Sequence, residues 1–143
     1  MTWVLVADAS KARIFNTTGS KEPLVEIKGM LHGESRRKVS ELVSDQPGRQ
    51  SGNGPTSSHG VAEKSAIKER ERDTFARELC DLLAAGREQD RFRRLYLVAP
   101  SQMLGALHKH LDKNVKAAVQ GEFDLQLVKA SNEDIRNHLP EYL

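Results

Sequence analysis

The sequence has few of the residues that link a small protein covalently or through a metal. Cys80 is the only cysteine among 143 residues, so the chain can form neither an internal disulfide nor a cluster of thiolate ligands. A chain of this length buries roughly 68–70% of its unfolded surface and holds a core without such links. We therefore expect a single domain over residues 1–143, with no cofactor and no metal site.

Long apolar runs and a strong net charge are also missing. No stretch approaches the ~20 apolar residues of a membrane-spanning helix, and the first residues, which reach an acid at Asp8, lack the basic region of a targeting peptide. We expect no membrane insertion and a cytoplasmic location. The 22 basic and 20 acidic side chains leave a net charge of +2. This balance excludes the global positive field of a dedicated nucleic-acid binder, so any such role must be local.

Apolar segments near the N-terminus predict three short strands. They cover residues 2–7, 12–16 and 24–30 and are rich in Val, Ile, Leu, Phe and Trp. The segments between them are polar and have the composition of turns. Because the connections are short, we expect an antiparallel three-stranded meander.

A segment with nothing to bury lies in the middle of the chain. Residues 46–60 contain no aliphatic or aromatic side chain, and ten of these fifteen residues are Gly, Pro, Ser or Thr. Such a composition does not offset the entropy lost on ordering the chain, so it predicts an exposed, mobile loop. Residues 38–44, just before this loop, have helical spacing over one or two turns.

A long helix follows the loop. Residues 61–85 contain no Pro or Gly and are rich in Glu, Lys, Arg, Ala and Leu, and Gly86 is expected to end the helix. Phe75, Leu79 and Leu83 form an apolar stripe along its second half. Its first half has few apolar residues. We therefore expect the helix to begin in solvent and to enter the core only around Phe75.

The C-terminal part alternates strands and helices. The apolar run at 95–99 predicts a buried parallel strand, and Ser101 is the expected cap of the next helix. A further strand is expected at 123–128, and Ser131 with Asp134 has the spacing of a capping box for a last short helix. This order predicts an α/β fold with a five-stranded mixed sheet of order 3-2-1-4-5 flanked by helices, the ribonuclease-H-like layout.

Metal-dependent nuclease chemistry is disfavoured. It needs three or four carboxylates around two Mg²⁺ ions. Asp8 stands at the end of the first strand, but the end of the fourth strand carries Pro100 and no acid. Asp8 is better interpreted as a turn residue followed by Ser10. No enzymatic activity has positive support from these residues.

Basic residues give the main functional signal. Lys64, Lys68 and Arg72 recur every four residues and are expected on one solvent face of the long helix. Acidic residues are interleaved with them, so a plain solvated helix stays an open alternative. Together with the loop at 46–60, this start of the helix forms a basic arm suited to a ribose-phosphate surface. The candidate RNA-binding residues are Arg36, Arg37, Lys38, Gly48, Arg49, Ser51, Lys64, Lys68 and Arg72.

Five segments carry a pattern shared with known proteins. They read WVLVADASKARIF at 3–15, DQPGR at 45–49, FAREL at 75–79, LVAP at 97–100 and LGAL at 104–107. Over nearly its whole length the chain resembles the bacterial host attachment protein family, which is named for the attachment of bacteria to host cells. That family is also similar to the central domain of archaeal and eukaryotic class-1 peptide release factors and of Pelota. The resemblance implies the same ribonuclease-H-like layout.

The resemblance to release factors also implies a catalytic candidate. Their loop before the long helix carries Gly-Gly-Gln, whose Gln places water on the peptidyl-tRNA ester. The corresponding loop here includes Gly48, Arg49 and Gln50, which makes Gln50 the candidate. Arg49 stands where the release-factor backbone must turn freely and pack close to RNA. The resemblance therefore favours binding to the ribosome or tRNA over hydrolysis.

Three functions follow as hypotheses. The leading one is a cytoplasmic, non-enzymatic module that binds RNA or the ribosome through the basic arm. The second is release-factor-like hydrolysis of peptidyl-tRNA through Gln50. The third is a protein-interaction or regulatory factor in host-cell attachment, with no nucleic-acid partner. The oligomeric state is left open.

Overall fold

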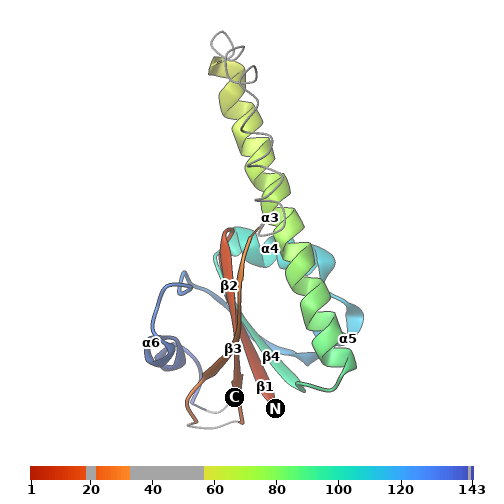
Figure 1. Cartoon of the computed structure of the whole chain (residues 1–143), viewed down its shortest axis with the longest axis vertical. Helices are drawn as coiled ribbons and strands as arrows, with labels where there is room; N and C mark the ends of the chain where they lie inside the picture. The colour runs from red at the N-terminus through yellow and green to blue at the C-terminus, as the bar shows by residue number, and fades with distance from the viewer. Residues whose placement is uncertain (19–21, 33–56, 142) are drawn as a thin grey trace.

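The computed structural model describes residues 1–18, 22–32, 57–141 and 143, and for residues 57–62 it describes the backbone alone (Figure 1). The predicted short helix at 38–44 and most of the predicted loop at 46–60 lie outside the described residues. Residues 57–60 are helical, so the loop prediction is wrong for its last part. Ser and Gly are tolerated there because the first N–H groups of a helix have no intrahelical partner.

A five-stranded mixed sheet forms the centre of the described part of the molecule. Its order is β3-β2-β1-β4-β5, as predicted. The first three strands form the expected antiparallel meander, and β4 and β5 run parallel to β1. The strands are β1 (Thr2–Ala7), β2 (Lys11–Thr17), β3 (Val25–Leu31), β4 (Arg94–Ala99) and β5 (Val119–Asp124). The α/β fold class is thereby confirmed.

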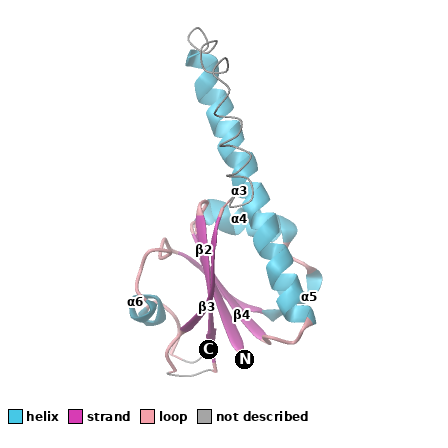
Figure 2. Cartoon of the chain, viewed as in Figure 1, coloured by secondary structure: helices cyan, strands magenta, loops and turns pink. Residues whose placement is uncertain are grey.

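Helices cover both faces of this sheet (Figure 2). One face packs against α3 (Ser57–Glu88), α4 (Ser101–His110) and α5 (Lys113–Ala118), and the other packs against α6 (Asn132–Asn137). The central strand β1 is buried along its whole length because its side chains alternate between the two cores. Leu5 lies in the core under α3, whereas Val4 and Val6 lie in the core under α6.

The long helix α3 projects well beyond the sheet (Figure 1). Residues 63–70 are all exposed, whereas Phe75, Ala76 and Leu79 are fully buried. The expectation that the helix enters the core around Phe75 is confirmed. Burial of an apolar side chain contributes roughly 1.5–3 kcal/mol. The second half of α3 therefore fixes the helix on the sheet.

Gly86 does not end α3, which continues to Glu88. A Cβ at this position would lie 2.7 Å from Cη2 of Trp3. The Trp3 ring is itself packed against Phe92, with 4.7 Å between the ring centroids. Gly86 is therefore required inside the helix, where it lets the indole ring approach the backbone. The prediction treated it as a terminator, which is wrong for this tertiary reason.

The last strand lies earlier in the chain than predicted. β5 spans Val119–Asp124 rather than residues 123–128, and the short helix α5 before it was not predicted. Asp112 caps α5, because its carboxylate accepts a hydrogen bond of 3.0 Å from the Asn114 backbone N–H. Beyond β5 the apolar side chains of the segment, including the buried Val128, fill the core under α6 without strand pairing.

The N-termini of α6 and α4 differ in how they are capped. Ser131 caps α6 as predicted, since its hydroxyl accepts a 3.1 Å hydrogen bond from the Asp134 backbone N–H. Ser101 does not cap α4. It is the first helical residue, Pro100 takes the capping position, and no side chain caps the helix there. Pro is favoured at this boundary because it needs no hydrogen-bond partner for a backbone N–H.

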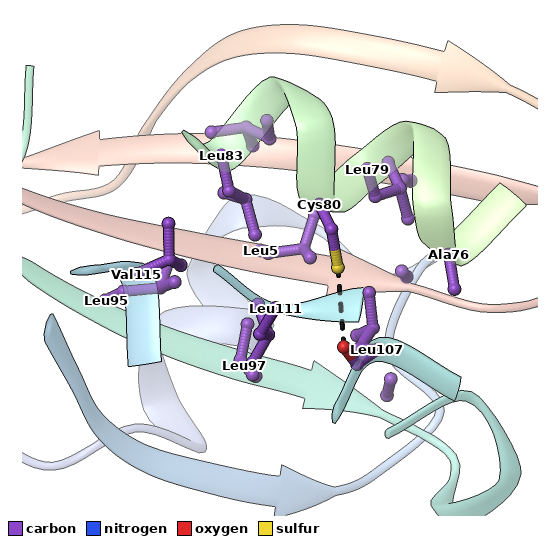
Figure 3. Close-up of a cluster of buried hydrophobic side chains, with 14 of the residues drawn as sticks. Leu5, Ala76, Leu79, Cys80, Leu83, Leu95, Leu97, Leu107, Leu111 and Val115 are labelled. Carbon is purple, nitrogen blue, oxygen red and sulfur yellow. Dashed lines mark hydrogen bonds between the residues drawn. The ribbon is translucent and has the colours of Figure 1, made fainter. Parts of the chain in front are cut away.

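The core between α3, α4 and the sheet encloses the single cysteine (Figure 3). The Cys80 thiol donates a 3.4 Å hydrogen bond to the backbone carbonyl of Leu107. Burial, together with the nearby charge of Asp81, raises the pKa of Cys80 to about 12. The thiol therefore stays protonated at neutral pH and serves packing rather than nucleophilic chemistry.

Candidate functional site

The basic row of α3, which consists of Lys64, Lys68 and Arg72, continues the face of the helix that is buried further along. At about 100° per residue, Lys68 and Arg72 align with Phe75 and Leu79. Lys64 and Lys68 are exposed, as predicted. Arg72 is partly buried and lines a pocket with residues that follow the strands. The sheet ends at this level, so the face that is apolar over the sheet becomes basic beyond it.

The cations of the basic row have no partner among the residues that the structure describes. Lys64, Lys68 and Arg72 take part in none of the hydrogen bonds and ion pairs found there. Two carboxylates of α3 are engaged elsewhere: Asp73 by His110, at 2.9 Å, and Glu71 by His32, at 3.9 Å. Within the described part of the chain, no carboxylate is paired with the row.

A pocket of about 230 Å³ lies where β1, β4 and β5 end. We call it the strand-end pocket. The carboxyl ends of parallel strands meet at one edge of a sheet, and open α/β sheets bind ligands at that edge. Asp8 follows β1, Gln102 lies just after β4, Gln126 follows β5, and Arg72 reaches the pocket from α3. Three segments distant in sequence thus share one polar site with the basic row.

Asp8 shapes the turn between β1 and β2. Its Oδ1 accepts hydrogen bonds from the backbone N–H groups of Ser10 and Lys11, both at 2.8 Å, and from the Ser10 hydroxyl at 3.0 Å. Oδ2 accepts a 3.3 Å hydrogen bond from the side-chain amide of Gln126. Partial burial acts to raise the pKa of Asp8, but these hydrogen bonds outweigh it and lower the pKa below its ordinary value. The carboxylate is ionised and has the turn role that the sequence predicts.

A second hollow, of about 510 Å³, runs between α3 and α4. We call it the α3–α4 groove. Ser65, Glu69 and Arg72 line it from α3, and Gly105 and Lys109 line it from α4. Gln102, like Arg72, borders both this groove and the strand-end pocket. The two hollows therefore adjoin and form one polar depression beside the basic row.

A histidine–carboxylate pair lies beside the groove, which Asp73 lines. Nε2 of His110, at the end of α4, lies 2.9 Å from Oδ1 of Asp73 on α3. The hydrogen bond from His110 is the largest influence on Asp73, and it holds the pKa of that carboxyl below its ordinary value of 3.8. Arg77 approaches the same carboxylate at 3.9 Å. The contact between His110 and Asp73 joins α4 to α3 at the level where α3 leaves the core.

The structure describes only some of the predicted site residues, and their binding role stays a prediction. Lys64, Lys68 and Arg72 lie on α3, where about 100° per residue places them on one side of the helix. The remaining candidates lie outside the described residues and stay predictions: Arg36, Arg37, Lys38, Gly48, Arg49, Gln50 and Ser51. Sequence reasoning missed Gln102, Gln126 and Lys109. The rule that ligands bind beyond strand ends points to the two glutamines, whereas only the packing of α4 on α3 places Lys109.

The part of the chain that the structure describes has neither a candidate metal site nor a candidate membrane-spanning helix. There, no group of three or more His, Cys, Asp or Glu side chains is arranged to hold a metal ion. Likewise, none of the helices described is long and apolar enough to span a membrane.

Comparison with known proteins points to one family. A family model described as "Protein required for attachment to host cells" matches residues 3–139. The match covers all five strands and the four helices named above except Thr2, the first residue of β1. Among curated proteins, none matches this chain.

Proposed function

The chain belongs to the family of proteins required for attachment to host cells, and we propose that its biochemical activity is to bind RNA or the ribosome through the basic row of α3. The family description names a process and no chemistry. A binding module of this kind needs no catalytic residue. The proposal includes a cytoplasmic location and ribosomal RNA or tRNA as the partner.

One observation carries the proposal: three cations that have no hydrogen-bond or ion-pair partner among the described residues recur every four residues on one helix. This helix projects from the sheet (Figure 1). At 1.5 Å per residue, positions four apart are separated by about 6 Å along the helix axis. Side chains at this spacing can reach successive phosphates of a nucleic-acid strand. Two carboxylates of the same helix, Glu71 and Asp73, are paired with histidines and not with these cations.

The experiment is the salt dependence of binding. Purified wild-type protein is titrated with ribosomes and with tRNA at several salt concentrations. The triple variant Lys64→Ala, Lys68→Ala, Arg72→Ala should bind more weakly and lower the slope of log K against log[salt] by roughly 2–3, because each lost phosphate contact contributes ~0.7–0.9. The control variant Lys113→Ala, Lys116→Ala, Arg93→Ala removes the same charge from exposed positions outside the basic row and outside α3.

The control should keep the wild-type affinity and slope. Equal slopes for the two triple variants would contradict the proposal, since the effect would then follow net charge alone. Absence of binding by the wild type would contradict the proposal and would favour a protein-interaction function. Release of labelled peptide from loaded ribosomes, measured for wild type and Gln50→Ala, tests the hydrolytic alternative.

A further inference from the structure

We propose that the α3–α4 groove seats the ribose-phosphate backbone of a single-stranded RNA and that Gly105 forms its floor. This inference rests on the proposed function, because the groove opens beside the basic row and shares Arg72 with it. It adds a second contact region on α4, a helix that neither the sequence nor the family description connects with a ligand.

Gly105 is the observation that carries the inference. It lies inside α4 and is exposed. A Cβ built on it would meet no atom within 4 Å. Glycine weakens a helix interior relative to alanine, and here no neighbouring side chain needs the space. Gly86 shows the opposite case, where a Cβ would strike Trp3 at 2.7 Å. Packing therefore explains Gly86 and leaves Gly105 unexplained, whereas a ligand backbone lying close to α4 would explain it.

The charges of the groove suit a phosphate strand. Arg72 comes from α3 and Lys109 from α4, so cations reach the groove from both helices. Of the two carboxylates, Asp73 is already held by His110. Glu69 and Ser65 supply oxygen atoms that can accept hydrogen bonds from ribose 2′-hydroxyl groups. An acidic peptide would satisfy the cations but would offer no row of hydroxyl donors to these acceptors.

The groove also continues into a second polar space. The strand-end pocket of about 230 Å³ adjoins it through Arg72 and Gln102. That volume is below the roughly 300–1,000 Å³ of sites for drug-sized ligands. It fits a single small group, such as one base or phosphate of the same strand, better than a separate ligand. The two hollows thus form one path beside α3.

The test separates blocking of the groove from loss of the fold. Gly105→Ala and Gly105→Leu are measured beside Ala117→Leu, which adds the same apolar side chain at an exposed position of α5. The probe is a short mixed-sequence single-stranded RNA labelled with fluorescein, and binding is followed by fluorescence anisotropy. Gly105→Ala should raise the urea midpoint of unfolding while weakening RNA binding. Gly105→Leu should weaken binding by about tenfold, and Ala117→Leu should bind like the wild type.

A charge variant gives an independent measurement. Lys109→Ala should lower the slope of log K against log[salt] by about 0.7, the contribution of one phosphate contact on a single strand. Lys116→Ala, an exposed lysine of α5 outside the groove, should leave the slope unchanged. A structural role for Lys109 would alter stability without altering the slope.

The outcomes distinguish this inference from the proposed function. If the triple variant of the basic row loses RNA binding while Gly105→Leu and Lys109→Ala match their controls, the groove is not used and the proposed function stands. If the wild type binds no RNA, both fall. If polyglutamate binds the wild type more tightly than the RNA does, and Gly105→Leu weakens the binding of polyglutamate alone, the groove holds an acidic peptide, and the assignment to RNA is overturned.

Discussion

The two halves of α3 present the same helix face to very different surroundings. Over the sheet, that face carries Phe75, Leu79 and Leu83, which are fully buried. Beyond the sheet, it carries Lys64 and Lys68, which are exposed, with Arg72 between the two environments. The helix itself is continuous from Ser57 to Glu88. The change of chemistry therefore follows the edge of the sheet and not a change in secondary structure.

This difference shows how one helix can have two separate roles. The apolar half anchors α3 because most helical stability in proteins comes from packing of an apolar face. The basic half contributes little burial, so its sequence is free to serve a partner. Asp73 and His110 lie at the boundary and join α3 to α4 there. Substitutions on the two sides of that boundary should therefore affect different measurements.

The largest expected effect is on the buried half. Phe75→Ala should lower the free energy of unfolding by about 3–5 kcal/mol, because it removes a fully buried aromatic ring and leaves a cavity. Urea unfolding followed by circular dichroism gives the value. An exposed site on the same helix, Ala85→Ser, serves as the control. A loss for Phe75→Ala as small as that of the control would mean that α3 is not anchored as described.

Gly86→Ala should give the next largest effect. The added Cβ would lie 2.7 Å from the Trp3 ring, and overpacking of this kind costs about 1–3 kcal/mol. That cost exceeds the roughly 0.5–1 kcal/mol that alanine gains over glycine in a helix. The variant should therefore unfold at a lower urea concentration than the wild type. Gly105→Ala is the matched control and should shift the midpoint in the opposite direction.

A smaller, pH-dependent effect is expected at the boundary. Because the pKa of Asp73 is lowered in the fold, its carboxylate contributes stability above its ordinary pKa of 3.8, and that contribution is lost as the pH falls through the folded-state value. Asp73→Asn should therefore be less stable than the wild type at pH 7, and the difference should shrink below about pH 4. The control is Asp81→Asn, at an exposed position of the same helix. A difference that stays constant with pH would refute the role of the carboxylate.

The smallest effect on stability is expected for the protruding half. Replacing Lys64, Lys68 and Arg72 together with Ala should change the free energy of unfolding by no more than about 0.5 kcal/mol per site. Removal of like charges four residues apart even relieves a small repulsion. Thermal unfolding by differential scanning calorimetry provides the measurement. A large destabilisation would show that the basic row also stabilises the fold. The two halves of α3 would then differ less than described.

The strand pattern was predictable because it depends on short-range hydrophobic periodicity. β1, the meander and β4 follow directly from their apolar runs. β5 was displaced because residues after Phe123 are equally apolar, and only pairing with β4 selects Val119–Asp124. The basic row could be predicted from its spacing. The direction in which it faces could not, because helical periodicity alone does not show where the sheet ends.

The sequence by itself determined the fold class, the sheet order and the point at which α3 enters the core, since these depend on which segments have apolar residues to bury. Tertiary structure decided the rest. Gly86 lies inside a helix because Trp3 packs on it. Arg72 lines one pocket with Asp8 and Gln126 because three strand ends meet beneath α3. Contacts between residues far apart in the chain leave no local pattern. For that reason, the depression beside α3 becomes visible only once the chain has folded.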